Sequence, residues 1–280
     1  MNQLLLVFHF IFVLTFLFFS GSLALLTFKY FLNIQWLNDL LPILQRCLNL
    51  FFPMVGMFII ELLFLPSLYS WKNELIDSSS FRGFYLQTDT FCIRAVIYFL
   101  VWFSLKKKLT AQPENESKES FALPLILILF TMSFASFDWL LSLDSYFSST
   151  IYGLQIVLVA LLFTYNFALR TLKAAPEANI LIDLNTFQLS LIGLWSYLVL
   201  IQLITIWSAN LSREAHYYVV RSHGPEKVIT IFLAVFQILI PIFLLFFRKL
   251  KQSFRFTQLL ASSNLLMQTL YVFWLFRKEG

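Results

Sequence analysis

The sequence predicts an all-α integral membrane protein with about eight transmembrane helices. Of its 280 residues, 59% are hydrophobic and 12% are charged, and the mean hydropathy is +0.78. Soluble domains carry about 25% charged residues, so this chain has too few polar groups to cover a globular surface, and lipid must cover it. Helices are expected because a segment in hydrocarbon has to satisfy its own backbone hydrogen bonds.

Eight apolar runs come close to the roughly 20 residues that a helix needs to cross a bilayer. In chain order, within one transmembrane domain, the predicted spans are Leu4 to Phe28, Leu48 to Tyr69, Phe84 to Leu105, Phe121 to Leu141, Thr150 to Leu172, Leu184 to Ser208, Lys227 to Phe247 and Thr257 to Phe276. The first run resembles a secretory signal, but no basic residue precedes it and it exceeds a signal-peptide core in length, so we expect a true span. The last run contains polar residues that are tolerated where a helix faces other helices: Ser262, Ser263, Asn264, Gln268 and Thr269.

The positions of Lys and Arg predict the orientation. With eight spans, the loops on the side away from the termini hold twelve of these residues and the side with the termini holds seven. Cytoplasmic loops carry an excess of Lys and Arg, so both termini are expected to lie outside the cytoplasm. The net charge of +5 is explained by the Lys and Arg residues that set this orientation. No soluble segment has the basic stripe with interleaved aromatic residues that is typical of a protein that binds nucleic acid.

The chain shows no redox centre or catalytic triad of its own. Cys47 and Cys92 lie far apart, which excludes the cysteine runs of iron-sulfur clusters and haem attachment. A membrane haem requires two histidines at matched depth, yet His216 and His223 share one loop and only His9 lies in a span. No metal site or covalently bound cofactor is therefore predicted, and electrons would have to move through partners or through a diffusible carrier.

Ionisable residues inside the predicted spans are expensive to bury and are functional candidates. Glu61 lies more than two turns from either end of its run. It is either a protonatable group facing the bundle interior, with Arg94 as one candidate partner, or a hydrogen-bonded structural residue. Arg94 and Tyr98 are four residues apart and project from one face of the third helix. The guanidinium could hold a carboxylate or a ligand carbonyl, or extend to the interface.

Asp138 and Asp144 do not form a same-face pair on one helix. Six residues at 100° each place them about 120° apart. If the fourth helix ends near Leu141, Asp138 lies in its last turn, where a carboxylate opposes the helix dipole unless a cation pairs with it. Asp138 is therefore the sharper functional candidate, and Asp144 is expected to shape the following turn.

Several segments resemble a known family. The stretch FDWLLSLDSYFSSTIYG (137–153) is similar to the aromatic-acid segment of the second polysulfide-reductase-like membrane subunit of alternative complex III, a bacterial quinol-oxidising complex. Three more segments agree in order and spacing: GFYLQTDTFCIRAVIYFLVW (83–102), LWSYLVLIQLITIWSANLSREAHYYVVR (194–221) and FQILIPIFLLFFRKLK (236–251). The resemblance extends from about Gly21 to Trp274.

The chain departs from the family at several titratable positions. LPSLYSW, around Pro66 to Trp71, lacks the family's histidines, and LLMQTLYVFW lacks a late His and Asp. Gln87 replaces an asparagine, Gln237 replaces a histidine, and Ser212 and Arg213 stand where Pro and Glu are usual. The family commonly has ten spans, so this chain is expected to lack one at each end.

The resemblance implies two four-helix bundles in the cytoplasmic membrane of a bacterium, packed beside a paralogous quinone-binding membrane subunit. It also implies extracytoplasmic multihaem cytochrome and iron-sulfur partner subunits, which would hold the haem and the clusters. The implied role is quinone or quinol interaction, proton translocation, or both. With Glu61, the proton-transfer candidates are Asp138 and Asp144. Quinone or polar-site candidates are Arg94, Tyr98, Trp139, Ser142, Ser149, Thr150, Tyr152, Trp207, Asn210 and Arg221.

Two alternatives remain at this stage. The chain could be a structural membrane scaffold that descends from such a subunit and has lost its proton path, as the missing histidines suggest. An unrelated transporter is less favoured, because no pair of Gly/Pro-broken helices marks a site at the membrane midplane.

Overall fold

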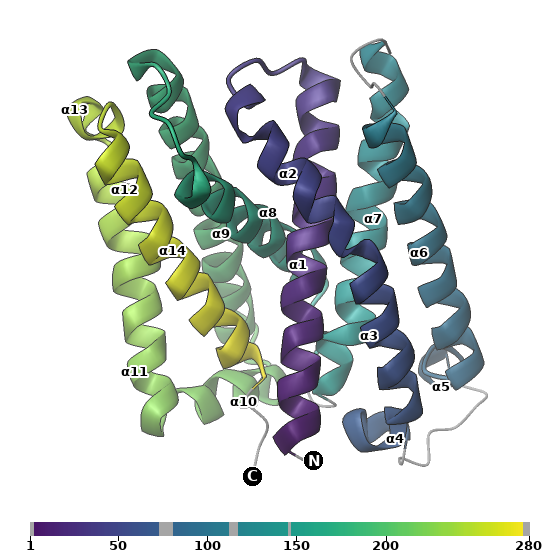
Figure 1. The fold of residues 1–280 in the computed structure, drawn as a ribbon. Coiled ribbons are helices and arrows are strands. Elements are labelled where there is room, and N and C mark those ends of the chain that lie inside the picture. The colour runs from purple at the N-terminus through teal and green to yellow at the C-terminus, as the bar shows by residue number, and fades with distance from the viewer. Residues whose placement is uncertain (1–2, 73–80, 112–116, 145–146, 277–280) are drawn as a thin grey trace.

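The computed structural model describes residues 3–72, 81–111, 117–144 and 147–276. Over these ranges, all regular structure is helical, which confirms the predicted fold class. The helices run up and down in a bundle, and both termini lie at the same end (Figure 1). Seven segments are long and apolar enough to cross a membrane: Gln3–Leu32, Asn38–Leu63, Thr88–Thr110, Lys118–Leu143, Tyr152–Thr171, Ala178–Ser208 and Gly224–Leu245. The chain is an all-α, multi-pass membrane protein.

The bundle has a first half, α1 to α7, and a second half, α8 to α14. The first half contains α1 (Gln3–Leu32), α2 (Leu41–Cys47), α3 (Phe51–Leu63), α4 (Leu65–Leu68), α5 (Phe81–Tyr85), α6 (Thr88–Thr110) and α7 (Ala122–Trp139). The second half contains α8 (Tyr152–Thr171), α9 (Ala178–Ser208), α10 (Ser212–Arg221), α11 (Gly224–Phe232), a π-helical turn (Leu233–Leu239), α12 (Ile240–Leu245), α13 (Arg248–Lys251) and α14 (Phe254–Leu275).

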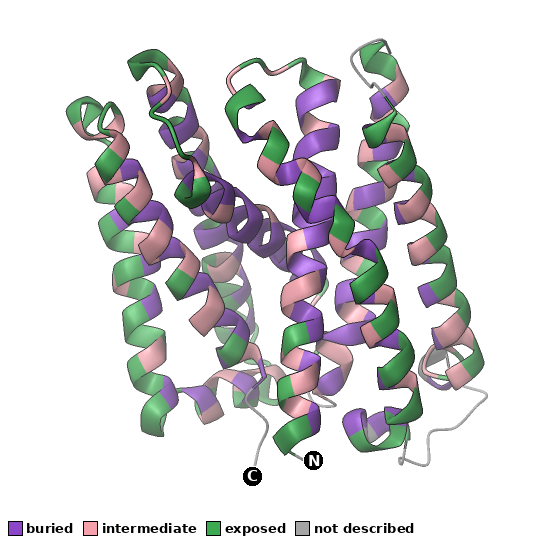
Figure 2. Cartoon of the chain, viewed as in Figure 1, coloured by how far each residue is buried: buried purple, intermediate pink, exposed green. Residues whose placement is uncertain are grey.

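Helix α8 joins the two halves. It packs against α1 and α7 on one side and against α9 and α14 on the other. Figure 2 shows α8 and the middle of α1 buried almost throughout, whereas the surrounding helices expose their outer faces. Those outer faces carry large apolar side chains, as expected for surfaces that contact lipid; examples are Leu63, Leu100, Phe130, Phe243 and Leu259.

Small residues allow α1 and α8 to approach closely. At Gly21, an added Cβ would overlap the carbonyl oxygen of Ala160 and the hydroxyl of Thr164. The Thr164 hydroxyl donates across the interface to the Leu17 carbonyl oxygen at 3.1 Å. Ser22 donates in the same way to the carbonyl oxygen of Leu44 in α2. Small side chains and interhelical hydrogen bonds are the usual means of helix association in membranes.

The eighth predicted span corresponds to α14. At 22 residues it is long enough to cross, but it is not among the seven segments that are also sufficiently apolar. Its polar residues Asn264 and Gln268 are 0% exposed, and α14 packs mainly on α8 and the π-helical turn. The prediction that its polar residues face other helices is confirmed for these two.

The predicted bounds of the second span are wrong. We expected Leu48 to Tyr69, whereas the observed segment is Asn38–Leu63. Phe64 leaves helical geometry (φ −113°, ψ 19°), and the separate α4 begins at Leu65 with Pro66 in its first turn. The earlier start follows from buried leucines between polar residues, at Leu37, Leu40 and Leu44. Glu61 therefore lies two residues before the end of α3, and not in the middle of a span.

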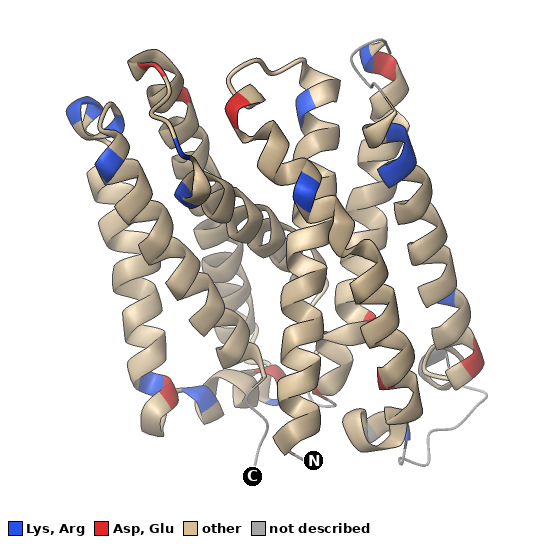
Figure 3. Ribbon diagram, viewed as in Figure 1, with Lys and Arg blue, Asp and Glu red and all other residues tan. Residues whose placement is uncertain are grey.

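Other boundaries differ less. Helix α6 starts at Thr88, because Leu86 and Gln87 form a non-helical turn after α5. Helix α9 begins at Ala178, six residues earlier than expected. The seventh span is interrupted by the π-helical turn. Lys and Arg concentrate at the end of the bundle opposite the termini, as Figure 3 shows.

Candidate functional site

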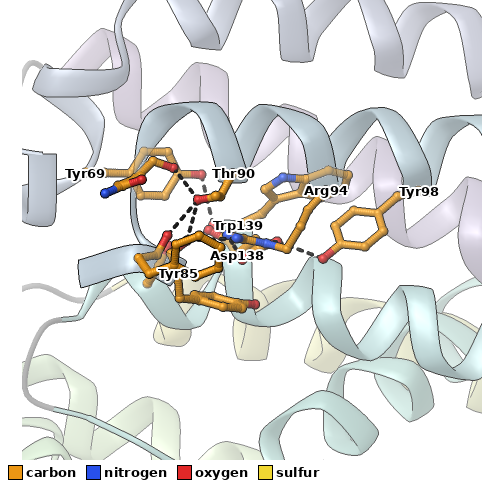
Figure 4. A network of polar contacts seen from close by, with 10 residues as sticks. Tyr69, Tyr85, Thr90, Arg94, Tyr98, Asp138 and Trp139 are labelled. Carbon is orange, nitrogen blue, oxygen red and sulfur yellow. Dashed lines mark hydrogen bonds and ion pairs between the residues drawn. The ribbon is translucent and has the colours of Figure 1, made fainter. Parts of the chain in front are cut away.

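Arg94 and Asp138 form a bidentate ion pair near the end of the bundle that holds the termini (Figure 4). Nε of Arg94 donates to Oδ2 of Asp138 and Nη2 donates to Oδ1, both at 2.9 Å. The Tyr98 hydroxyl also donates to Oδ2, at 2.8 Å. Asp138 is 1% exposed. The predictions that Arg94 and Tyr98 share a face and that Asp138 lies in the last turn of its helix are confirmed.

The turn between α5 and α6 completes the surroundings of the guanidinium. Nη1 of Arg94 donates to the Tyr85 carbonyl oxygen at 2.7 Å, and the guanidinium lies 3.7 Å from the centroid of the Tyr85 ring. The Thr90 hydroxyl fixes this turn by donating to the Phe84 carbonyl oxygen at 2.8 Å. Burial, and then the Asp138 carboxylate, raise the pKa of Tyr85 above its usual value. Tyr85 is therefore a neutral phenol at physiological pH.

A second buried pair lies between α1 and α3. Nδ1 of His9 is 2.9 Å from Oε1 of Glu61, and these residues are 0% and 2% exposed. The predicted pairing of Glu61 with Arg94 is wrong, because Glu61 contacts His9 and Arg94 contacts Asp138. The reason is the position of α1, which packs on both α3 and α7 and so places His9 beside Glu61.

The end of α7 connects the two pairs. Nε2 of His9 lies 3.0 Å from the carbonyl oxygen of Trp139, the residue that follows Asp138. The Tyr69 hydroxyl donates weakly to the same oxygen, at 3.5 Å. Burial, followed by Glu61 and then Asp138, raises the pKa of Tyr69. Both carboxylates therefore act on Tyr69, which lies between the two pairs.

The Trp139 side chain forms the apolar wall around both pairs. Its ring is 0% exposed and lies in edge-to-face contact with rings from α1, at centroid distances of 5.1 Å to Phe12 and 5.3 Å to Phe16. It also packs on Phe58 of α3 and Phe99 of α6. Such aromatic packing excludes water from the charged groups, which strengthens their electrostatic interaction.

The depth of the site is set by its position along α6. Arg94 lies six residues from the start of α6, or about 9 Å along the helix axis at 1.5 Å per residue. A lone charge taken from water at such a place costs several kcal/mol. The bidentate geometry compensates for part of this cost, since charge-assisted bonds are about twice as strong as neutral ones.

Two clefts lie beside the Arg94–Asp138 pair. Tyr85, which stacks on Arg94, lines both of them. The larger has a volume of about 600 Å³ and the smaller about 390 Å³; small-molecule sites usually span about 300–1,000 Å³. The larger is mostly apolar, with Phe134, Phe137, Leu141, Ile151, Ile206 and Leu211 among its lining residues. Its polar lining comes from Ser148, Ser149, Thr150, Gln202, Thr205 and Glu214, with the Tyr85 phenol.

The other candidates between residues 142 and 150 shape these clefts. The Ser142 hydroxyl donates to the Asp138 carbonyl oxygen. Asp144 accepts from the Phe147 backbone N–H at 3.2 Å, which is the turn-forming contact expected of it. The Ser149 hydroxyl donates to Oε1 of Gln202 at 3.0 Å, so the loop is tied to α9. Thr150 is exposed and lines the larger cleft.

The remaining four candidates serve other parts of the same end. Arg221 donates to the carbonyl oxygens of Tyr217 and Trp274, at 2.9 and 3.2 Å, and so holds α10 against α14. Tyr152 is 3% exposed, whereas Trp207 is 82% exposed and points outward. Asn210 has a φ of 49° and lies two residues after the end of α9 at Ser208. The hydrogen bonds described above for Arg221 lead to α10 and α14, and not to the Arg94–Asp138 pair.

The sequence did not single out Tyr85, Tyr69 or the pairing of His9. His9 and Tyr69 contact partners that are distant in sequence; His9 lies 52 residues from Glu61 and 130 from Trp139, and Tyr69 lies 70 from Trp139. Tyr85 lies only nine residues before Arg94, but no motif marked it. The one signal available was a histidine within an apolar run, since such a group needs a buried partner. The described residues contain no group of three His, Cys, Asp or Glu side chains that could hold a metal ion.

No family model matches the chain, and no curated protein matches it at a significant level.

Proposed function

We propose that this chain is an integral membrane subunit of a quinol-oxidising respiratory complex of the alternative complex III type, contributing to quinone interaction, proton translocation, or both. The observation that carries the proposal is the buried Asp138 carboxylate, held by the half-buried Arg94 and by Tyr98, beside an apolar cleft of about 600 Å³. The resemblance of residues 137–153 to the family's aromatic-acid segment supports the same function.

The larger cleft has the chemistry that a quinol requires. A quinol has an apolar tail and ring with two hydroxyl groups, so its site needs apolar walls and a few polar groups. Phe134 lines the cleft and is 42% exposed on the outer face of α7, so a lipid-soluble molecule can enter from the membrane. The Tyr85 phenol lies between the cleft and the ion pair, where it can contact the polar end of the ligand.

Quinol oxidation releases two protons and two electrons. In this proposal the electrons pass to haem and iron-sulfur groups in extracytoplasmic partner subunits. The protons pass to carboxylates of the membrane subunits, among them Asp138. A paralogous quinone-binding subunit would lie beside this chain in the cytoplasmic membrane of a bacterium, with the candidate site at the outer face.

A labelling experiment tests the proposed orientation. In a chain whose Cys47 and Cys92 are replaced by alanine, single cysteines are introduced at the two ends of the bundle. Thr110→Cys replaces the last residue of α6, at the end away from the termini, and Ser222→Cys lies directly after α10, at the end that holds the termini. Both positions are exposed. A membrane-impermeant maleimide added to spheroplasts is expected to label Ser222→Cys alone, and lysis should expose Thr110→Cys. The opposite pattern would place the termini in the cytoplasm.

The Asp138→Asn substitution tests the proposed function. In the complex purified from its native membrane and reconstituted in vesicles, we expect the rate of quinol oxidation to fall about tenfold or more, because positioned acid–base groups contribute 10²- to 10⁴-fold, or the number of protons that appear on the outer side of the membrane per quinol to fall. Tyr98→Phe, which removes one hydrogen bond and keeps the ion pair, should have a smaller effect. Asp89→Asn is the matched control, since Asp89 is an exposed carboxylate in the first turn of α6.

A structural scaffold is the second candidate. It is favoured by the hydrogen bonds of the Asp138 carboxylate, which already accepts three of them from Arg94 and Tyr98 and is thereby held as a structural group. The same experiment separates the two functions. If Asp138→Asn assembles normally and both quinol turnover and proton yield are unchanged, Asp138 has no part in the mechanism and the scaffold is the better description.

A further inference from the structure

We propose that His9 and Glu61 form a proton-holding site, distinct from the Arg94–Asp138 pair, that loads and releases one proton as the charge at that pair changes. The role of this site in turnover rests on the proposed function. Its existence does not, because it follows from the geometry of the two side chains and of the Trp139 carbonyl group.

The geometry fixes where the protons of His9 lie. The Trp139 carbonyl oxygen can only accept, so Nε2, at 3.0 Å from it, must carry a hydrogen and donate. Nδ1 and Oε1 of Glu61 are 2.9 Å apart, and one hydrogen must lie between them. That hydrogen belongs either to an imidazolium facing a carboxylate or to a carboxylic acid facing a neutral imidazole. The pair holds two labile protons and has no net charge in either form.

Loading adds a third proton and gives an imidazolium beside a protonated carboxyl group, with a net charge of +1. In the proposed function this proton comes from a quinol hydroxyl. Unloading passes it to water and restores the neutral pair. No electron moves to or from the pair, and no bond between heavy atoms forms or breaks.

Apolar surroundings make the pair sensitive to nearby charge. The His9 ring packs against the rings of Phe12 and Phe276, at centroid distances of 5.8 and 5.3 Å. Among the described residues, the titratable and charged groups that face the pair are Tyr69, which follows α4, Asp138 of α7 and, through Asp138, Arg94 and Tyr98 of α6. With water excluded, the charge at Asp138 is screened weakly.

Glu61 also has an unused oxygen. Its Oε2 is buried and has no hydrogen-bond partner among the described residues. A buried carboxylate oxygen without a donor is destabilising, so the site favours an additional donor such as water or a hydrated proton. Tyr69 stands between this pair and the smaller cleft, since its ring packs on His9 and on Trp71, which lines that cleft.

Nitrogen NMR of the histidines in the intact complex tests for the site. The chain has three histidines, and the exposed His216 and His223 serve as internal references. We expect Nε2 of His9 to be protonated at every pH that preserves the fold. We expect the Nδ1 signal to move when pH is lowered, and to move again when Asp138→Asn changes the neighbouring charge. A His9 spectrum that does not respond to pH or to Asp138→Asn would show a fixed structural pair and overturn the proposal.

Glu61→Gln supplies the second measurement. It keeps the size of the side chain and an acceptor oxygen for His9 but cannot take up the shared proton. We expect the pH at which the Nδ1 signal moves to change, because the imidazole then takes up a proton without sharing one with a carboxyl group, while the exposed control Glu119→Gln leaves that pH unchanged. Tyr69→Phe should keep Nε2 protonated but weaken the response of His9 to Asp138→Asn. A pH response of Nδ1 in Glu61→Gln that is identical to that of the wild type would contradict a shared proton.

Turnover separates this inference from the proposed function. In a complex that oxidises quinol, Glu61→Gln is expected to lower the number of protons that appear on the outer side of the membrane per quinol more than the rate of oxidation. Equal loss of both would indicate a purely structural role for Glu61. If the wild-type complex does not oxidise quinol at all, the proposed function fails, and the NMR response of His9 still decides whether the proton-holding site exists.

Discussion

A Gly21→Ala substitution is expected to destabilise the protein by about 3 kcal/mol or more, the upper range for overpacking a core. The added methyl group would overlap the Ala160 carbonyl oxygen, and its nearest carbon contact would be the Ala160 carbonyl carbon at 2.7 Å. These are backbone atoms in the middle of α8, so α1 and α8 would have to move apart. Thermal unfolding in detergent should show a melting temperature lower by roughly 6 to 12 °C.

Gly56→Ala is the matched control for this substitution. Gly56 lies inside α3, and no atom lies within 4 Å of the position of an added Cβ. Because alanine is the better helix former, the control is expected to gain about 0.5–1 kcal/mol. A loss of stability as large as that of Gly21→Ala would show that the close α1–α8 approach is not the cause.

Arg94→Leu is expected to cost about 3–5 kcal/mol of stability, because it leaves the Asp138 carboxylate buried without its cation. Asp138→Leu should cost a similar amount by leaving Arg94 unpaired. The double variant should recover much of either loss, since replacing a whole buried ion pair by apolar residues is often nearly neutral. Thermal unfolding of the four proteins in a double-mutant cycle measures this coupling.

Arg255→Leu is the control for this cycle. Arg255 is exposed at the start of α14, at the opposite end of the bundle, so its removal should change stability by no more than about 0.5 kcal/mol. If the losses in the Arg94 and Asp138 single variants simply add in the double variant, the two residues are not coupled and the site would have to be described differently.

Composition and run length were sufficient to predict the fold class. Apolar runs locate the helices because lipid leaves few alternatives to a helix. The bounds of the Asn38–Leu63 span could not be predicted in this way, because its first turns mix buried leucines with Asp39, Gln45 and Arg46. Whether such residues lie inside the bundle or beyond the lipid depends on α1 packing against them, and that packing is not visible in local sequence.

Only those features of the candidate site that depend on local sequence could be predicted. The spacing of Arg94 and Tyr98 and the position of Asp138 at a helix end are local features, and both led to correct geometry. The partner of Glu61 was not predictable, because His9 and Trp139 come from other helices. The larger cleft is likewise assembled from α5, α7, α9, α10 and a loop, so no single segment contains its signature.

The central position of α8 restricts how this protein can work. Its contacts with α1, α7, α9 and α14 leave no hinge plane along which one half could rock against the other without separating Gly21 from Ala160. Alternating access by rigid-body tilting, as in many secondary transporters, would have to break this close contact. We therefore expect a proton that crosses the chain to move through rotation of individual side chains and rearrangement of hydrogen bonds.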